Sequence, residues 1–273
     1  MEYLKVILYG IIEGITEWLP ISSTGHLILA EKLLALPYSE EFMSMFRVVI
    51  QLGAILAVVV LYFPRLWPFT TDARHKYQRP EVWQLWFKIL VATLPAMVLG
   101  LLLDDWLDAH LYNYITVAAM LILYGVFFIL IENRHRRPTV RRMDQLTYRH
   151  ALIIGCWQVL AMIPGTSRSG ATIVGGLLLG LARPVAAEFT FFLAIPVMAG
   201  ASGLKLVKFL ADGGTFTGGE VAALALGCAV AFVVSVAAIR FLVSFVQKHD
   251  FKVFGWYRIA LGAVVLAAAF LGF

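Results

Sequence analysis

Long apolar stretches recur along the whole chain and constrain its fold more than any other feature. Only 14% of the 273 residues are charged, against roughly 25% in soluble domains. A helix needs about 20 apolar residues to cross the hydrocarbon core of a bilayer. We therefore predict an all-α polytopic membrane protein, with residues 1–273 forming a single integral membrane domain. Six stretches approach the required length: about 42–63, 83–103, 113–131, 188–210, 220–245 and 254–273.

Two further apolar regions, about 1–34 and 148–182, are interrupted midway by proline, glycine and hydroxyl residues. The interruptions occupy residues 20–25 and 164–170. Broken backbone at membrane depth is tolerated only where protein or a water-filled cavity satisfies its polar groups. We expect each region to form a re-entrant helical hairpin, and the alternative is an ordinary kinked span.

The two interrupted regions also resemble each other, and each precedes three spans. WLPISSTGHLIL at 18–29 aligns with MIPGTSRSGATIV at 162–174 with one gap. This likeness predicts an internal duplication, with repeat one at about 1–131 and repeat two at about 148–273. Because three is odd, the second repeat must enter the membrane from the opposite side. The repeats are then inverted, as in many transporters.

Loop charges predict the orientation in the membrane. The positive net charge of +5 gathers in short loops without interleaved aromatic residues, which argues against nucleic-acid binding. By the span count, the basic loops 64–82 and 132–149 share one side, and loop 104–112 with its three aspartates lies on the other. The positive-inside rule makes the basic side cytoplasmic and places both termini outside. The first hairpin then opens outward and the second inward, so their tips can meet.

Glu13 and Glu17 are four residues apart, which places both carboxylates on one face of a helix. Two ionised carboxylates in a poorly solvated site need a cation, or one must take up a proton. Mg²⁺ is commonly held by one or two carboxylates together with substrate phosphates, and Ca²⁺ also prefers oxygen ligands. We predict that this pair binds Mg²⁺ or Ca²⁺. The alternative is that both acids face water at the interface.

The polar run continues through Ser22, Ser23, Thr24 and His26. His26 has no cysteine partner and no histidine at helical spacing, which excludes zinc. We expect His26 to act as a general base or to contact phosphate, rather than to be a packed core histidine. The neighbouring hydroxyl groups are candidate phosphate ligands.

Arg168 stands between Ser167 and Ser169 in a turn flanked by glycines. A guanidinium group there can bind phosphate oxygens in a bidentate manner. The alternative is an arginine that snorkels to the interface, although no interface lies nearby in the sequence. Arg47 and Gln51, again four residues apart, are candidate auxiliary contacts lining the same cavity.

These motifs resemble those of the BacA-type undecaprenyl-diphosphate phosphatases, a family of bacterial inner-membrane enzymes. The resemblance covers the whole chain and implies hydrolysis of undecaprenyl diphosphate to undecaprenyl phosphate and inorganic phosphate. It also implies dependence on a divalent cation, an active site at the outer face and bacitracin resistance. The first signature comprises Glu13, Glu17, Pro20, Ser22, Ser23, Thr24, Gly25 and His26, and the second Pro164, Gly165, Ser167, Arg168, Ser169 and Thr172.

Under this resemblance, Glu13 and Glu17 hold the cation, and Arg168 stabilises the transferring phosphoryl group with help from Ser167, Ser169 and Thr172. Ser23 or a water molecule attacks, and His26 or Glu17 accepts its proton. A lipid-carrier flippase or transporter is the main alternative, since inverted repeats are a transporter architecture. The phosphatidic-acid-phosphatase pattern fails because no histidine follows Arg168 at the required spacing. The oligomeric state is left open, with a homodimer among the options.

Overall fold

Helices account for most of the described backbone. The computed structural model describes residues 1–70, 78–134 and 137–271, without the side chains of 31–33, 104, 105 and 108. Within this part of the chain, the extended pairings are isolated bridges such as that between Val140 and Leu181. The α-helices are α1 (Glu2–Thr16), α2 (Ser23–Leu33), α3 (Glu40–Val49), α4 (Gln51–Leu61), α5 (Phe63–Leu66), α6 (Pro80–Leu111), α7 (Tyr114–Asn133), α8 (Tyr148–Val159), α9 (Arg168–Leu178), α10 (Arg183–Ala211), α11 (Gly218–Lys248) and α12 (Lys252–Phe270), and the short 3₁₀ turns are η2 (Met143–Gln145) and η3 (Leu160–Met162).

The predicted polytopic all-α architecture is confirmed. Six helical segments among the described residues are long and apolar enough to cross a membrane, and they match the six predicted spans. The first of these spans consists of α3 and α4, which follow each other directly through Ile50. The spans are Glu40–Leu61, Pro80–Leu103, Tyr114–Asn133, Arg183–Ala211, Gly218–Lys248 and Lys252–Phe270.

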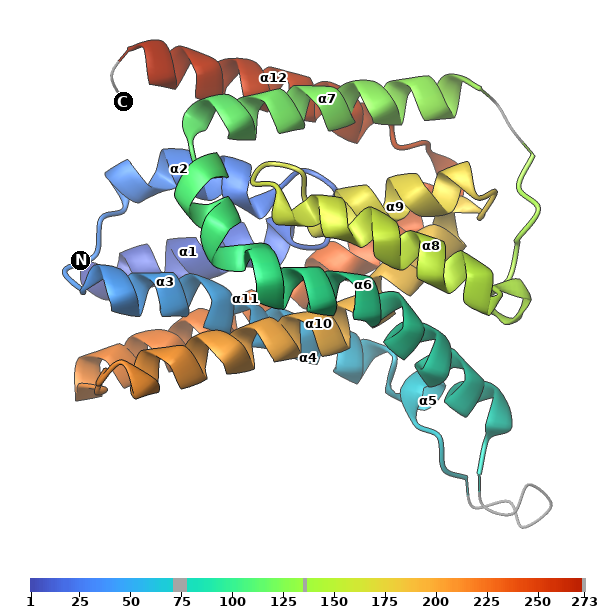
Figure 1. Ribbon diagram of the computed structural model, residues 1–273, viewed down its shortest axis with the longest axis horizontal. Coiled ribbons are helices and arrows are strands. Elements are labelled where there is room, and N and C mark those ends of the chain that lie inside the picture. Colours follow the sequence, from blue (N-terminus) through green and yellow to red (C-terminus); the bar gives the residue numbers. More distant parts are fainter. Residues whose placement is uncertain (71–77, 135–136, 272–273) are drawn as a thin grey trace.

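Each interrupted region forms two helices separated by a break, as predicted. The first break lies between α1 and α2, and the second, which includes η3, lies between α8 and α9. Figure 1 shows that the α1–α2 hairpin opens at the side where the chain begins, whereas the α8–α9 hairpin opens at the opposite side. The breaks of both hairpins therefore lie inside the helix bundle.

The helices of the two halves pack in reciprocal pairs. Helix α1 packs against α11, and its counterpart α8 packs against α6, the counterpart of α11. The last spans, α7 and α12, pack against each other, as do the first spans, α3–α4 and α10. This exchange of partners is what a two-fold relation between halves would give. The duplication itself and the inverted placement of the halves in a bilayer stay predictions.

The contact between α7 and α12 is close because glycines meet there. A Cβ atom added at Gly125 would lie 2.7 Å from the carbonyl oxygen of Gly255, and one added at Gly255 would lie 2.7 Å from that of Gly125. Small residues allow membrane helices to approach backbone to backbone, which gains packing energy that lipid cannot supply. The two last spans thus form a tight pair.

The described parts of the predicted basic loops 64–82 and 132–149 lie at the side of the molecule opposite to the chain's first residues (Figure 1). Helix α12 ends on the side where α1 begins, as expected for termini that share a side. Some charges used for the orientation, namely Arg74, Lys76, Arg136 and the side chains of Asp104, Asp105 and Asp108, lie outside the described residues. The assignment of the basic side to the cytoplasm stays a prediction.

Candidate functional site

Helices α2 and α9 begin in the same unusual way. Their N-cap residues, Ser22 and Ser167, have φ angles of 72° and 71° and are the non-glycine residues with positive φ in the described parts of the chain. The Oγ atom of Ser22 accepts a hydrogen bond from Gly25 N at 3.3 Å, and that of Ser167 accepts one from Gly170 N at 3.2 Å. Such backbone strain costs about 1–3 kcal/mol per residue and concentrates at functional sites. Both helix N-termini are also natural anion sites.

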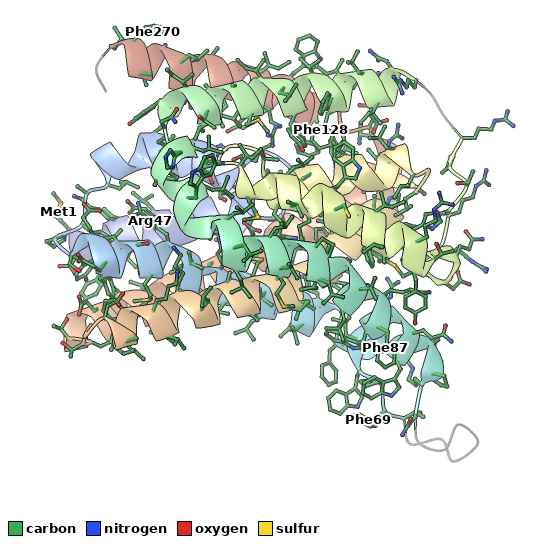
Figure 2. The ribbon with its side chains drawn as sticks, in the orientation of Figure 1. Met1, Arg47, Phe69, Phe87, Phe128 and Phe270 are labelled. Carbon is green, nitrogen blue, oxygen red and sulfur yellow. The ribbon has the colours of Figure 1, made fainter. Side chains whose placement is uncertain are left out.

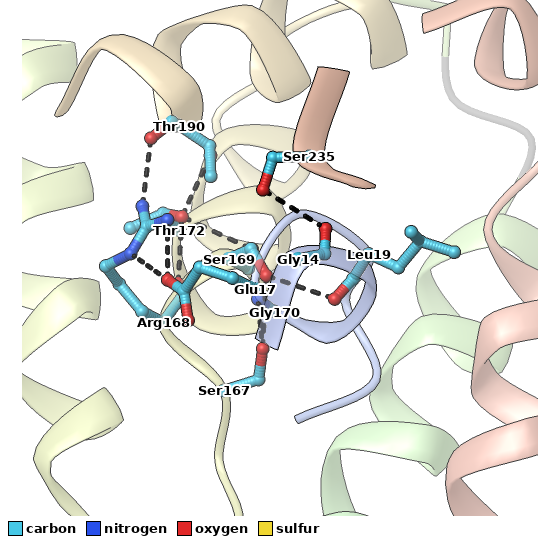
Figure 3. Close-up of polar contacts among 10 residues, drawn as sticks. All are labelled: Gly14, Glu17, Leu19, Ser167, Arg168, Ser169, Gly170, Thr172, Thr190 and Ser235. Carbon is cyan, nitrogen blue, oxygen red and sulfur yellow. Dashed lines mark hydrogen bonds and ion pairs between the residues drawn. The ribbon is translucent and has the colours of Figure 1, made fainter. Parts of the chain in front are cut away.

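An ion pair joins the two hairpins where they meet. Arg168 donates from Nε and Nη2 to the same oxygen, Oε1 of Glu17, at 3.0 and 2.9 Å (Figure 3). Its Nη1 atom donates to the carbonyl oxygen of Thr190 on α10, also at 3.0 Å. The guanidinium carbon lies 5.8 Å from the ring centroid of Trp18. Both charged side chains are about nine-tenths buried, so each offsets the cost of placing the other in the membrane interior.

Hydroxyl groups extend this network. Ser169 Oγ lies 3.1 Å from Ser167 Oγ, and it donates to the carbonyl oxygen of Leu19 in the first hairpin at 3.4 Å. Thr172 Oγ1 is 2.8 Å from Thr190 Oγ1 and donates to the carbonyl oxygen of Arg168 at 3.0 Å. Thr172 therefore links α9 to α10 and holds the start of α9 in place.

Glu13 is the one acid of this region that the protein leaves unsatisfied. The side chain is fully buried, and neither carboxylate oxygen makes a hydrogen bond of good geometry to the described residues, although Glu17 and Gln51 lie close enough to interact with it. Its polar neighbours are Glu17 and Gln51. A buried carboxylate without a partner is costly, so this position suits a bound cation or a proton.

The donor set for a cation is small. The described residues contain no group of three or more His, Cys, Asp or Glu side chains that could hold a metal by themselves. Glu13 and Glu17 supply two carboxylates, and Gln51 adds an amide oxygen. Mg²⁺ usually keeps several waters and binds one or two carboxylates together with substrate phosphates. The residues present fit that manner of binding.

A cavity of about 940 Å³ approaches this cluster at Gln51, a neighbour of Glu13, but Glu17 and Arg168 are not among the residues that line it. Ser23, Thr24, Arg47 and Gln51 form a polar part of its wall. Much of the remaining wall is apolar and comes from α6 and α10, where Lys205 adds a further cationic group. Arg47 lies toward the side of the molecule that carries Met1, away from Phe69 and Phe87 (Figure 2). Gln51 is shared by the cavity wall and by the surroundings of Glu13, so the buried acids lie directly behind the polar end.

His26 faces a different neighbour. Its Nδ1 atom lies 2.7 Å from the carbonyl oxygen of Ser22, and its Nε2 atom lies 2.7 Å from the hydroxyl oxygen of Tyr257 on α12. The two rings are stacked with an interplanar angle of 13°. The imidazole is thus held by α12 and is not among the residues that line the cavity.

Comparison with known proteins gives the family of the chain. The family described as Bacitracin resistance protein BacA matches residues 6–264. The chain belongs to the BacA family. An undecaprenyl-diphosphatase of Enterococcus faecalis is 58% identical over 264 residues, which cover 96% of this chain and 95% of that protein. An undecaprenyl-diphosphatase of Desulfitobacterium hafniense is 60% identical over 269 residues, which cover 97% of this chain and 95% of that protein. An undecaprenyl-diphosphatase of Limosilactobacillus fermentum is 54% identical over 269 residues, which cover 98% of this chain and 97% of that protein.

In this BacA-family chain, the predicted site residues fall into four groups. The network around the ion pair contains Glu17, Arg168, Ser167, Ser169 and Thr172. Glu13 lies next to it. Ser23, Thr24, Arg47 and Gln51 line the cavity, and Ser22 and His26 contact each other between that cavity and α12. The roles assigned to these residues stay predictions.

Three residues near the site were missed by the sequence reasoning: Thr190, Tyr257 and Arg258. Thr190 and Tyr257 carry no local motif, and only the fold brings them to Arg168 and His26. Arg258 did carry a signal, because an arginine stands there inside the predicted span 254–273. Charges within membrane spans are rare and usually functional.

Proposed function

We propose that this BacA-family chain hydrolyses undecaprenyl diphosphate to undecaprenyl phosphate and inorganic phosphate. The observation that carries the proposal is the ion pair between Glu17 and Arg168, which joins two hairpins beside a large cavity. Relatives that match nearly the whole chain bear the name undecaprenyl-diphosphatase. An arginine that neutralises charge and acids that can hold a metal ion are recurring parts of phosphoryl-transfer sites.

The cavity suits a lipid diphosphate. Its polar end, formed by Ser23, Thr24, Arg47 and Gln51, can take the charged head group. Its apolar wall, contributed by α6 and α10, can cover the first isoprene units of the tail. The volume of about 940 Å³ is at the upper end of ordinary ligand pockets, which span about 300–1,000 Å³. A full polyprenyl chain is longer than this, so the rest of the tail lies in lipid.

The negative charge of the phosphoryl group is stabilised by Arg168 and by the N-termini of α2 and α9. These helices present backbone N–H groups and the positive ends of their dipoles. Glu17 holds the guanidinium group in a fixed position, because two N–H groups of Arg168 donate to its Oε1 atom. A preorganised group of this kind stabilises developing charge without having to reorganise during the reaction.

A divalent cation would be held by Glu13 and Glu17, with Gln51 within reach. When bound, Mg²⁺ or Ca²⁺ supplies positive charge that neutralises the diphosphate. The unpartnered oxygens of Glu13 support this placement. The chain's own residues bring the terminal phosphate to Ser23 at the polar end of the cavity.

The reaction forms a bond from the attacking oxygen to the terminal phosphorus and breaks the bond from that phosphorus to the bridging oxygen. The electron pair leaves with undecaprenyl phosphate. Ser23, which lines the cavity, attacks and is later released by water, or a water molecule attacks directly. Glu17 or His26 accepts the proton. If His26 does so, its hydrogen-bond partner Tyr257 fixes the orientation of the imidazole ring.

Arg47, which lines the cavity, lies toward the side of the molecule where the chain begins (Figure 2). With the basic loops in the cytoplasm, this side is the outer face of a bacterial inner membrane. The substrate head group would therefore be hydrolysed outside the cell membrane.

The test is phosphate release by the purified protein in detergent with undecaprenyl diphosphate as substrate. We expect hydrolysis that depends on Mg²⁺ or Ca²⁺ and stops with chelator. Detergent removes the two compartments that a transporter needs, so turnover there separates an enzyme from a lipid-carrier flippase. A folded protein that releases no phosphate under any cation would overturn the proposal.

A further inference from the structure

The side chain of Arg258 is fully buried and contacts the breaks of both hairpins. It extends from α12 to the point where the hairpins meet. Nη1 donates to the carbonyl oxygen of Pro20 at 3.2 Å in the first break. Nη2 donates to those of Gly165 and Thr166, both at 2.9 Å, in the second break. One guanidinium group thus connects two backbone segments that are almost 150 residues apart in sequence.

Arg258 also anchors this junction to α7. Its Nε and Nη2 atoms lie 3.4 Å from the carbonyl oxygens of Leu121 and Met120. Its guanidinium carbon lies 5.6 Å from the ring centroid of Tyr124. All of these hydrogen-bond partners are carbonyl oxygens of the main chain, so the positive charge is met by dipoles rather than by an acid.

Broken helices expose carbonyl groups that have no partner within the helix. Inside a membrane no bulk water is present to satisfy them. A guanidinium group carries five N–H donors in one plane and can serve several carbonyls at once, which an ammonium group on a flexible stem does less well. The chemistry of the breaks therefore explains why an arginine stands at this position.

The second hairpin is shaped around this side chain. A Cβ atom at Gly170 would lie 3.2 Å from Arg258 Nη1 and 3.3 Å from Ser167 Cβ, both closer than ordinary van der Waals contact. At the corresponding position of the first hairpin, a Cβ atom on Gly25 would instead meet methyl groups of Leu121 and Leu261, at 3.0 and 3.3 Å. Only one of the two equivalent glycines thus makes room for the guanidinium group.

We propose that Arg258 is a positioning residue for the phosphate site: it fixes the two hairpin breaks relative to each other, so that Ser23 and Arg168 address the same phosphoryl group. The inference rests on the proposed phosphatase function for its kinetic test. Arg258 itself acts through the main chain and does not touch the substrate. Its cationic charge also lies behind the N-termini of α2 and α9, where it adds to the attraction for an anion.

The kinetic test compares Arg258→Met and Arg258→Lys with the wild type. We expect Arg258→Met to lower kcat at least 100-fold while KM changes less than threefold, because the cavity that holds the lipid stays intact. Arg258→Lys should recover at least a tenth of the wild-type kcat, since it keeps the charge and some of the donors. Equal losses in kcat and in the fraction of folded protein, without recovery by lysine, would overturn the proposal.

Arg183→Met is the matched control. Arg183 also forms hydrogen bonds, with the buried carboxylate of Glu132, but its own side chain is partly exposed and lies at the N-terminus of α10, away from the breaks. Its loss should lower thermal stability and leave kcat of the folded fraction within threefold of wild type. A loss of kcat as large as that of Arg258→Met would show that loss of any structural arginine lowers kcat through folding alone.

A second measurement does not require turnover. Spin labels at Ile15→Cys and Leu152→Cys, both at exposed positions on the hairpin helices, report the distance between hairpins once Cys156 and Cys228 are replaced by alanine. Arg258→Met should broaden the distance distribution, and Arg183→Met should not. An unchanged distribution would overturn the positioning role even if the wild type hydrolysed no lipid diphosphate, so this result is separable from failure of the proposed function.

Should Arg258→Met not fold, Gly170→Ala provides the test. The added methyl group presses on Arg258 Nη1, so we expect a loss of kcat at least five times that of Gly25→Ala. In the Arg258→Lys background, the additional loss from Gly170→Ala should fall below twofold. Equal effects of the two alanine substitutions, or the same effect of Gly170→Ala in both backgrounds, would overturn the proposal.

Discussion

The two hairpins share a backbone design and differ in the side chains that it presents. In each, a serine with a left-handed backbone caps a helix and accepts a hydrogen bond from a glycine three residues later. At the next position, the first hairpin has Ser23 and the second has Arg168. The acids Glu13 and Glu17 belong to the first hairpin alone. The comparison teaches that a duplicated scaffold can become a site when its two copies acquire opposite charge.

The largest expected effect comes from removing the charge of the second hairpin. Arg168→Ala should lower kcat/KM by about 10³-fold or more, because an arginine on the transferring phosphoryl group is worth about 10³–10⁵ in related chemistry. The kcat/KM of Arg168→Lys should lie between those of Arg168→Ala and the wild type. Phosphate release from undecaprenyl diphosphate measures the effect, and full activity of folded Arg168→Ala would refute the division of charge between hairpins.

The next effect tests the acidic side of the comparison. Glu13→Gln removes one of two carboxylates, so the Mg²⁺ concentration for half-maximal activity should rise at least as much as the 10- to 100-fold seen when supporting groups of metal sites are lost. Titration of activity with Mg²⁺ in chelator-treated protein measures this change. An unchanged Mg²⁺ dependence would mean that Glu13 does not bind the cation.

A smaller effect should follow loss of the hydroxyl group that holds His26. Tyr257→Phe removes one hydrogen bond, worth about 1 kcal/mol, and should lower kcat by about five- to tenfold. His26→Ala should lower kcat more than Tyr257→Phe does if the imidazole accepts the proton. If Tyr257→Phe leaves kcat unchanged while His26→Ala lowers it, the imidazole acts without its hydrogen-bond partner on α12.

The smallest effects concern the shared backbone design. Ser22→Ala and Ser167→Ala each lose a cap and keep the strained φ, so each should lower the free energy of unfolding by about 1 kcal/mol. Ser22→Gly and Ser167→Gly lose the cap but relieve the strain and should lie within about 0.5 kcal/mol of wild type. Denaturant titration in detergent micelles provides the measurement. Different results for the two hairpins would argue against their structural equivalence.

The sequence allowed the prediction of features that depend on local composition. Span lengths follow from apolar runs, and the breaks follow from proline, glycine and hydroxyl residues at 20–25 and 164–170. Helix α5 and the extension of α6 to Leu111 were not predicted, because they lie beyond the apolar stretches. These differences do not alter the predicted number of spans.

The site was predictable only in part. Glu17 and Arg168 were predicted as site residues on two hairpins whose tips can meet, and the structure joins them in an ion pair. The pairing of His26 with Tyr257 was not predicted, because these residues are 231 positions apart and no local pattern links them. Arg258 differs from Tyr257 in this respect, since its charge was visible within an apolar span and was not used.

The backbone contact between Gly125 and Gly255 restricts where a lipid tail can enter between the helices. Helices α7 and α12 leave no room between them for an acyl or isoprenoid chain at that point. A long lipid tail must therefore enter from the bilayer by another gate. On α10, Gly200 and Gly203 line the cavity, and added Cβ atoms there would meet no atom within 4 Å. The cavity wall at Gly200 and Gly203 therefore leaves space for a lipid tail to enter from the bilayer while the head group is bound.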